Sequence, residues 1–348
     1  MAWGWRRRVE GVGDDRRGSM SDSMSSPRVV VAGTGFVSIR EHLFAVAPQV
    51  RLEMIERSAI MAEGAEADVL IPTMARVDGP LMDRVRGLKL IQQWGVGLEG
   101  VDVAAATRRG IAVARVASHG TGNAESVAEW CVMAAIALNR QLSAAQAGLR
   151  SGGAWGGPAG RALLGRSAGI LGLGGIGQAL AARLAPFGMR VRGVGRRADP
   201  VLAGRLGMEW VGGRDELGEL LSASDVLFLC LPLTSETRRI IDAAALERLP
   251  ADACLINPSR GGLIDHHALL AAIDEGRLLG AALDVFDQEP LDPASPLLTR
   301  PRILATPHIA GITDASYAGI ARRIADNLDR LAAGRPLVGC VNAEAPGG

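Results

Sequence analysis

Short runs of apolar residues alternate with longer amphipathic stretches along most of the chain. The runs are typical of strands buried on both faces, and the stretches between them are long enough for helices. Strands that alternate with helices predict parallel sheets covered by helices on both faces, which is an α/β fold. The first series of predicted strands comprises 28–32, 67–71, 88–92 and 111–114.

A second series of apolar runs begins at Ala168, and a length of 348 residues agrees with about two domains. Between the two series, 124–149 contains no proline and is rich in Ala, Leu and Met. It therefore predicts one long helix with Asn123 as its N-cap. A last helix is predicted over 315–333. The strands predicted for the second series are 168–171, 189–194, 226–231, 254–257, 279–283 and 303–305.

The composition is ordinary for a soluble globular protein, with 48% apolar and 22% charged residues. A formal net charge of +1 predicts no strong attraction to nucleic acid or to a membrane surface. The four cysteines show neither metal-ligand nor disulfide spacing, so we expect no metal site and a reducing, cytoplasmic location. These cysteines are Cys131, Cys230, Cys254 and Cys340.

The first 26 residues differ from the rest because charged positions are not followed by an apolar core. That pattern is not typical of a secretory signal, and three acidic residues argue against a transit peptide. We interpret 1–26 as a disordered tail. Met20 or Met24 is a candidate for the native start.

Three glycines, Gly172, Gly174 and Gly177, follow an apolar strand and precede a helical run. In this setting the first glycine permits a tight turn, and the second lets the backbone approach a pyrophosphate. The third lets helix and strand pack closely, with the helix N-terminus toward the phosphates. A turn without a ligand is the alternative. The cofactor contacts predicted in this turn are Gly172, Gly174, Gly175, Ile176 and Gly177.

The strand that follows this turn ends in Arg196 and Arg197 and carries no carboxylate. An acid at this place usually binds the ribose hydroxyls of NAD, whereas guanidinium groups bind a ribose 2′-phosphate. The sequence therefore favours NADP(H) as cofactor and leaves NAD(H) possible. In the alternative interpretation both arginines are merely solvated and Asp199 replaces the missing acid.

Three chemically active side chains, Arg260, Glu289 and His308, each follow an apolar run in the second series. Ligands of open α/β sheets gather beyond the carboxyl ends of the strands. Arg260 could bind a carboxylate with two hydrogen bonds and polarise a neighbouring carbonyl. His308 could act as general acid in reduction and general base in oxidation, with Glu289 orienting its ring.

Each of these residues also has a simpler interpretation, as a surface arginine, a turn glutamate or a structural histidine. His266 and His267 look like exposed residues at the start of a helix capped by Asp265, and we assign them no chemistry. His119 lies in a glycine-rich loop, and its role is left open.

Taken together, these motifs resemble the D-isomer-specific 2-hydroxyacid dehydrogenase family over about 27–341. The resemblance implies a Rossmann cofactor domain, 124–312, inserted into a flavodoxin-like substrate domain, 27–123 plus 313–348, both doubly wound. It also implies a homodimer joined largely through the helix predicted at 124–149. The matching stretches are 95–102, 123–129, 172–177, 231–234, 257–262, 284–290 and 307–311.

The resemblance also implies roles for individual residues. Arg260, Glu289 and His308 fall on the family's catalytic positions, and Asp284 on the residue that contacts the nicotinamide amide. Val96, Gly97 and Arg260 are implied to bind the substrate. The cofactor contacts implied outside the glycine turn and the arginine pair are Leu231, Pro232, Pro258, Ser259, Arg260, Asp284, His308 and Gly311.

The activity implied is reduction of a small 2-oxo acid, such as hydroxypyruvate or glyoxylate, to a D-2-hydroxy acid. Short-form D-3-phosphoglycerate dehydrogenase using NAD is the alternative, since no regulatory domain follows residue 348. Arg76 and Arg115 are candidates for its phosphate. A phosphite-oxidising relative shares the three catalytic residues, whereas formate dehydrogenase relatives have Gln at the position of Glu289. A non-catalytic dinucleotide-sensing corepressor is a remote alternative.

Two departures from the family pattern stand out. Gly195 occupies the position of the usual strand-end Asp, which puts a preference for NAD in doubt. Leu98-Glu99-Gly100 replaces the usual Asp-Asn pair after the first glycine loop.

Overall fold

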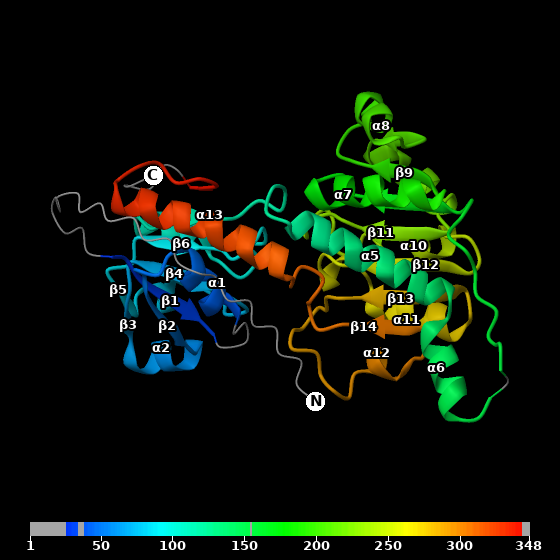
Figure 1. Cartoon of the computed structure of the whole chain (residues 1–348), viewed down its shortest axis with the longest axis horizontal. Coiled ribbons are helices and arrows are strands. Elements are labelled where there is room, and N and C mark those ends of the chain that lie inside the picture. Colours follow the sequence, from blue (N-terminus) through cyan, green and yellow to red (C-terminus); the bar gives the residue numbers. More distant parts are fainter. Residues whose placement is uncertain (1–25, 34–37, 154, 343–348) are drawn as a thin grey trace, which may run out of the picture.

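The computed structural model describes residues 26–33, 38–153 and 155–342. The predicted tail, 1–26, lies outside them except for its last residue. Two larger parallel sheets stand side by side, each with helices on both faces (Figure 1). The predicted α/β fold class is therefore confirmed, with the two sheets in flavodoxin-like and Rossmann order.

The first sheet has the strand order β2-β1-β4-β6-β7, which is the flavodoxin-like order of a doubly wound sheet. Its strands are β1 (Arg28–Ala32), β2 (Arg51–Ile55), β4 (Val69–Pro72), β6 (Leu90–Gln92) and β7 (Ala112–Ala114), with a small separate pair β3 (Ala65–Glu66) and β5 (Val85–Arg86). On one face pack α1 (Ser38–Val46) and α13 (Asp314–Ala332). On the other pack α2 (Arg57–Glu63), α3 (Gly79–Met82) and α4 (Val103–Arg108).

The second sheet has the order β10-β9-β8-β11-β12-β13-β14, which is the Rossmann order with one further strand. Its strands are β8 (Ser167–Leu171), β9 (Arg190–Val194), β10 (Trp210–Gly212), β11 (Val226–Leu229), β12 (Ala253–Asn257), β13 (Leu278–Leu283) and β14 (Ile303–Ala305). One face carries α5 (Asn123–Asn139), α7 (Gly175–Leu184) and α8 (Pro200–Leu206). The other carries α9 (Leu217–Ser222), α10 (Ala243–Arg248), α11 (His266–Asp274) and α12 (Pro296–Thr299).

The prediction of one long helix over 124–149 is wrong. The segment forms α5 and a second helix, α6 (Leu142–Arg150). The axes of the two helices point in different directions (Figure 1). Between them Gln141 has a φ of 50°, a left-handed conformation that ends one helix before the next begins. Asn123 is the first residue of α5, and Gly122 is the N-cap.

The chain crosses between the two sheets twice, just before α5 and just before α13. The two crossings are tied together by hydrogen bonds between Ser126 Oγ and Thr313 Oγ1, at 2.7 Å, and from Asn123 Nδ2 to Ser316 Oγ, at 3.2 Å. Gly319 of α13 lies against the carbonyl of Thr121, which leaves no room for a side chain there. The two crossing segments therefore pack directly against each other.

Among the described residues, no helix combines the length and the apolar character needed to cross a membrane.

Candidate active site

The loop after β12 presents Arg260 and is held by the buried Asn257. Asn257 Oδ1 accepts a hydrogen bond from Ser259 N at 3.0 Å, and its Nδ2 donates to the carbonyl of Arg260 at 2.8 Å. Ser259 Oγ donates to the carbonyl of Leu229 at 2.6 Å. Because these bonds tie the loop to β11 and to itself, the backbone of Arg260 has a fixed position.

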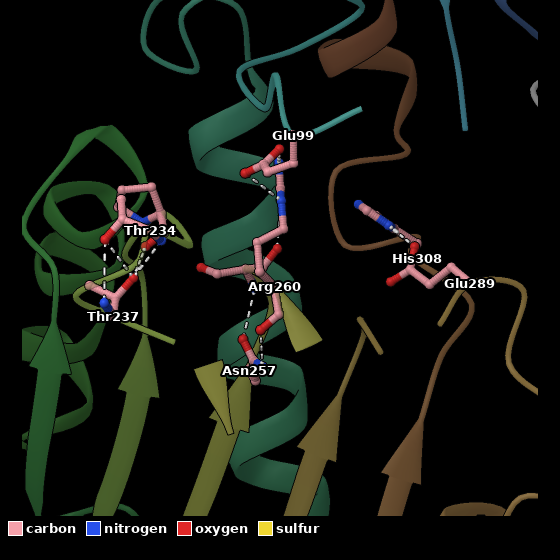
Figure 2. Close-up of polar contacts among 9 residues, drawn as sticks. Glu99, Thr234, Thr237, Asn257, Arg260, Glu289 and His308 are labelled. Carbon is pink, nitrogen blue, oxygen red and sulfur yellow. Dashed lines mark hydrogen bonds and ion pairs between the residues drawn. The ribbon is translucent and has the colours of Figure 1, made fainter. Parts of the chain in front are cut away.

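The guanidinium of Arg260 makes an ion pair with Glu99, which comes from the loop after β6 of the other sheet. Arg260 Nε lies 3.0 Å from Glu99 Oε1, and Nη2 lies 3.1 Å from Oε2 (Figure 2). Nη1 donates to the carbonyl of Ser259 at 2.6 Å. A carboxylate is thus already bound to the arginine that we predicted to bind one.

His308 and Glu289 form a hydrogen-bonded pair, with His308 Nδ1 2.7 Å from Glu289 Oε2 (Figure 2). Glu289 Oε1 accepts from the N–H of Phe286 at 2.9 Å. Burial alone would raise the pKa of Glu289, but the hydrogen bond and charge of His308, with help from Phe286 N–H and Arg260, lower that pKa. The carboxylate is therefore kept ionised and directed at the imidazole.

The loop that carries His308 is organised around the buried Asp284. Asp284 Oδ1 accepts from Thr306 Oγ1 at 2.6 Å and from Ile309 N at 2.8 Å, and Oδ2 accepts from Ala310 N at 2.8 Å. Burial outweighs these bonds and raises the pKa of Asp284. His308 has a φ of 56°, a strained conformation for a non-glycine residue that the surrounding bonds must maintain.

Arg260 and the His308–Glu289 pair lie at the ends of adjacent strands, because β12, β13 and β14 are neighbours in the sheet. Figure 2 shows them facing the same space, and the charge of Arg260 reaches Glu289. This arrangement provides a cation for a carboxylate beside an imidazole whose second ring nitrogen is available for proton transfer.

The glycine turn between β8 and α7 has the geometry that its sequence predicts. Gly172 has a φ of +99° and lies against the carbonyl of Cys230, and Gly177 lies against the carbonyl of Gly172. Neither position has room for a side chain. Gly174 has no other atom within 4 Å of where a Cβ would stand, so its backbone is open to a ligand. The turn therefore fits a dinucleotide pyrophosphate.

A cleft of about 1410 Å³ extends from this turn along the strand ends. Six of the predicted cofactor contacts line it: Gly172, Gly174, Arg196, Arg197, Leu231 and Pro232. Gly175 does not line it, because Ser118 Oγ lies 2.6 Å from where its Cβ would stand and His119 follows closely. His119 therefore lies over the start of α7. The remaining predicted contacts, Ile176, Gly177, Pro258, Ser259, Arg260, Asp284, His308 and Gly311, also lie outside the lining.

Arg196 and Arg197 are exposed at the cleft, and within the described residues their side chains have no hydrogen bond or ion pair. Asp199, the alternative ribose ligand, instead caps α8 by accepting from Leu202 N at 2.8 Å. Nearby, Arg214 Nη1 lies 2.6 Å from Glu236 Oε2 at the same cleft. These two cations at the cleft therefore have no partner within the part of the chain that the structure describes.

The two residues predicted to bind the substrate through the loop after β6 differ in their surroundings. Val96 is partly exposed, whereas Gly97 lies directly beneath the guanidinium of Arg260, where a side chain would overlap it. Of the two arginines predicted for a phosphate, Arg115 lines the large cleft and Arg76 lines a separate hollow beside Glu99.

Sequence reasoning missed the roles of Glu99 and Asn257. Asn257 had a recognisable signal, because an asparagine two residues before a loop serine can bond to the backbone that follows it. The signal for Glu99 was weaker, because it consisted only of the departure from the family pattern at residues 98–100. The prediction that His266 is exposed is wrong, since its side chain is only 15% exposed and Nδ1 lies 3.5 Å from Asp287 Oδ2.

Among the described residues, no cluster of His, Cys, Asp and Glu could hold a metal ion. Burial raises the pKa of the Cys230 and Cys254 thiols to about 12. Neither thiol is therefore suited to act as a nucleophile.

The chain is similar to known dehydrogenases over most of its length. Residues 132–310 match the family model described as D-isomer specific 2-hydroxyacid dehydrogenase, NAD binding domain. A glyoxylate reductase from Thermococcus litoralis is 33% identical over 298 residues, which cover 83% of this chain and 87% of the relative. A D-3-phosphoglycerate dehydrogenase from Mycobacterium tuberculosis is 34% identical over 325 residues, 92% of this chain.

The matched region is only 59% of the length of that phosphoglycerate dehydrogenase, so the chain spans little more than half of this relative. Among solved structures, a D-isomer specific 2-hydroxyacid dehydrogenase from Xanthobacter autotrophicus Py2, in complex with NADPH and MES, has a TM-score of 0.69 and 26% identity. The superposition covers 92% of this chain and 99% of that one.

Proposed function

The chain belongs to the D-isomer specific 2-hydroxyacid dehydrogenase family, and on that premise we propose that it reduces a small 2-oxo acid to a D-2-hydroxy acid with NAD(P)H. The observation that carries the proposal is the 2.7 Å contact between His308 and Glu289 beside the guanidinium of Arg260. A proton donor and a carboxylate-binding cation at adjacent strand ends are what this reaction needs from a protein.

In this proposal, Arg260, Glu289 and His308 each have a distinct role. Arg260 binds the substrate carboxylate and polarises the carbonyl, with the backbone of Val96 and Gly97 alongside. Glu289 holds Nδ1 of His308, so Nε2 is the atom that gives its proton to the carbonyl oxygen. The same nitrogen takes the proton back in the oxidative direction. The nicotinamide, when bound, supplies or accepts the hydride.

We assign the cofactor to the large cleft, in a dinucleotide-binding domain of residues 124–312 that is inserted into a substrate domain of 27–123 plus 313–348. The open backbone at Gly174 supports a pyrophosphate there. Arg196 and Arg197 have no partner among the described residues. They support NADP(H) over NAD(H), since a 2′-phosphate would give both guanidinium groups a partner. The structural neighbour that holds NADPH agrees with this choice.

Hydroxypyruvate and glyoxylate are our first substrate candidates, in line with the similarity to a glyoxylate reductase. D-3-phosphoglycerate dehydrogenase activity with NAD is the second candidate, favoured by relatives of that name at 34% identity. The two candidates differ in whether the substrate brings a phosphate to the cleft.

We also propose a homodimer in the cytoplasm. The α5 and α6 segment exposes several large apolar side chains, which a partner subunit would cover. Four free cysteines suit a reducing compartment. Light scattering during size-exclusion chromatography tests the dimer directly. The exposed apolar residues are Met133, Ile136, Leu142 and Leu149.

The test of the function follows the absorbance of the reduced nicotinamide with purified protein. Hydroxypyruvate, glyoxylate and 3-phosphohydroxypyruvate are each supplied with NADPH or NADH at equal concentration, and Arg260→Ala serves as the inactive control. We expect rapid loss of the NADPH signal, slower loss with NADH, and neither in the control. Faster turnover with NADH and 3-phosphohydroxypyruvate would favour the second candidate instead.

A further inference from the structure

One arginine that lines the large cleft comes from the part of the chain that forms the first sheet. Arg115 follows β7, and it lines the cleft together with Gly172, Leu173 and Gly174 of the glycine turn. We propose that Arg115 binds the pyrophosphate of the dinucleotide, as a cofactor ligand supplied from outside the second sheet and its helices. The inference rests on the proposed function, because it takes this cleft to be the cofactor site.

The glycine turn offers a pyrophosphate no basic side chain of its own. Residues 172–177 are glycine, leucine and isoleucine, so phosphate oxygens there meet backbone N–H groups and the N-terminus of α7. A helix N-terminus acts as roughly half a positive charge, whereas each phosphate of a pyrophosphate is negatively charged. Much of the phosphate charge is therefore not compensated by the turn itself, and a guanidinium at the cleft would compensate it.

The backbone of Arg115 is held close to this turn. Arg115 N donates to the carbonyl of Gly339 at 3.1 Å, and Val116 N donates to the carbonyl of Gly95 at 2.8 Å. Three residues after Arg115, Ser118 Oγ lies 2.6 Å from where a Cβ of Gly175 would stand, at the start of α7. Three residues of backbone span at most about 10 Å. Arg115 is therefore anchored near the N-terminus of α7 and lines the same cleft as the turn.

The positive charge that lines the cleft without a partner falls into two groups. Arg115 is exposed, and its side chain has no hydrogen bond or ion pair to any described residue. Arg196 and Arg197, which follow β9, form the other group. The acids that line the cleft are engaged elsewhere, since Asp199 caps α8 and Glu236 is in an ion pair. NADPH likewise carries phosphate in two places, the 2′-phosphate and the pyrophosphate.

A phosphate on the substrate is the competing ligand for Arg115. Such a phosphate would lie only a few bonds from the carboxylate that Arg260 is proposed to bind. Arg260 and His308 do not line the cleft that Arg115 lines. The position of Arg115 beside the glycine turn therefore favours the cofactor.

Two substitutions separate the charge of Arg115 from its shape. Arg115→Ala removes the cation, whereas Arg115→Lys keeps the charge and loses the planar fork that binds two phosphate oxygens at once. Arg108→Ala, at an exposed position of α4, is the matched control for loss of an arginine elsewhere in the same part of the chain.

The first readout is the binding of two fragments of the cofactor, measured by calorimetric titration. ADP-ribose carries the pyrophosphate without the 2′-phosphate, and adenosine 2′-monophosphate carries the 2′-phosphate without the pyrophosphate. We expect Arg115→Ala to lower the affinity for ADP-ribose by about tenfold and to leave the affinity for adenosine 2′-monophosphate unchanged. Arg115→Lys should recover part of the loss, and Arg108→Ala should bind both fragments as the wild type does. An unchanged affinity for ADP-ribose in Arg115→Ala would overturn the inference and leave the cofactor site itself in place.

The second readout is the KM for each cofactor and each substrate. NADPH and NADH share the pyrophosphate, so Arg115→Ala should raise the KM for both by a similar factor of about ten and leave the KM for hydroxypyruvate unchanged. A rise confined to the KM for 3-phosphohydroxypyruvate would mean that Arg115 binds a substrate phosphate, and the inference would be wrong. Loss of ADP-ribose binding in Arg115→Ala, in a protein that reduces no 2-oxo acid, would support the inference and refute the proposed reaction alone.

Discussion

The two ends of the proposed active site differ in how their charged side chains are held. The catalytic residues stand beyond the ends of β12, β13 and β14, whereas Arg196 and Arg197 line the large cleft. At the catalytic end, Arg260 and His308 each have a carboxylate partner, and the loops beneath them are fixed by Asn257 and Asp284. At the other end, the Arg196 side chain has no hydrogen bond or ion pair to any described residue and lies exposed. The same is true of Arg197.

The difference follows from what each end has to do. Groups that take part in bond making must already stand in their working geometry, because reorganisation at the moment of reaction adds to the barrier. Charges that only bind a ligand phosphate can stay solvated until it arrives. Substitutions at the catalytic end should therefore lower kcat, and substitutions at the far end should raise the KM for the cofactor.

The largest effect is expected for His308→Asn. It removes the proton donor, and general acid catalysis contributes about 10² to 10⁴-fold, so kcat for 2-oxo acid reduction should fall within that range while cofactor binding persists. Stopped-flow or steady-state rates with saturating NADPH measure the loss. His267→Asn, on the exposed start of α11, is the control and should behave as the wild type. A fall of less than tenfold in His308→Asn would remove His308 from the mechanism.

Asp284→Asn tests whether the loop that carries His308 must be held in place by its hydrogen bonds to Asp284. An amide can replace only one of the two accepting oxygens, so either Ala310 N–H or the Thr306 and Ile309 donors would face an NH₂ group. One buried donor left unsatisfied costs about 1 to 3 kcal/mol. We expect a Tm several degrees lower together with a reduced kcat. Asp329→Asn, an exposed acid on α13, is the control. A full kcat at the lower Tm would show that the loop geometry is not needed.

In the large cleft, replacing both Arg196 and Arg197 by Ala should change the binding of one cofactor only. Loss of two charge-assisted hydrogen bonds, each worth about 1.5 to 3 kcal/mol, should raise the KM for NADPH by at least tenfold. The KM for NADH and the kcat with either cofactor should change little. Arg322→Ala, exposed on α13, serves as the control. Equal changes in the KM for NADPH and the KM for NADH would mean that these arginines do not bind the 2′-phosphate.

The smallest effect is the pH dependence of stability due to Glu289. The pKa of Glu289 is lowered in the folded protein. A carboxyl of this kind contributes stability above its unfolded pKa and loses that contribution as the pH falls through the folded pKa. Between about pH 5 and pH 3 the Tm of the wild type should therefore fall more steeply than that of Glu289→Gln. The pKa of Asp284 is raised instead. Both proteins contain Asp284, so its effect on the Tm is the same in each and does not contribute to the difference between them. Parallel curves would contradict the prediction.

The parts of the fold that the sequence revealed are those where the hydrophobic pattern is strong. Central strands such as β8 and β11 are buried throughout and were predicted within a few residues. The strand β2 escaped prediction because it mixes exposed and buried positions. The strand β10 escaped because its three residues, Trp-Val-Gly, include only two apolar side chains. The break at Gln141 also escaped, because nothing in its side chain requires a left-handed backbone.

For the site, the sequence indicated which residue types stand at the strand ends but not what they contact. Arg260 and Glu99 are 161 positions apart, and their ion pair depends on how the loops of two sheets meet. Local patterns carry no information about such a contact. The His308–Glu289 pair could be predicted because both residues follow adjacent parallel strands, whose ends must meet at one edge of the sheet.

Arg260, Glu289 and His308 at the strand ends are proposed to reduce a 2-oxo acid to the D-hydroxy acid. This role is tested by the product that the purified protein forms from hydroxypyruvate and NADPH, identified by chiral chromatography. We expect D-glycerate in an amount equal to the NADPH consumed, and none with His308→Asn over the same time. L-glycerate, or oxidation of NADPH without glycerate, would contradict it.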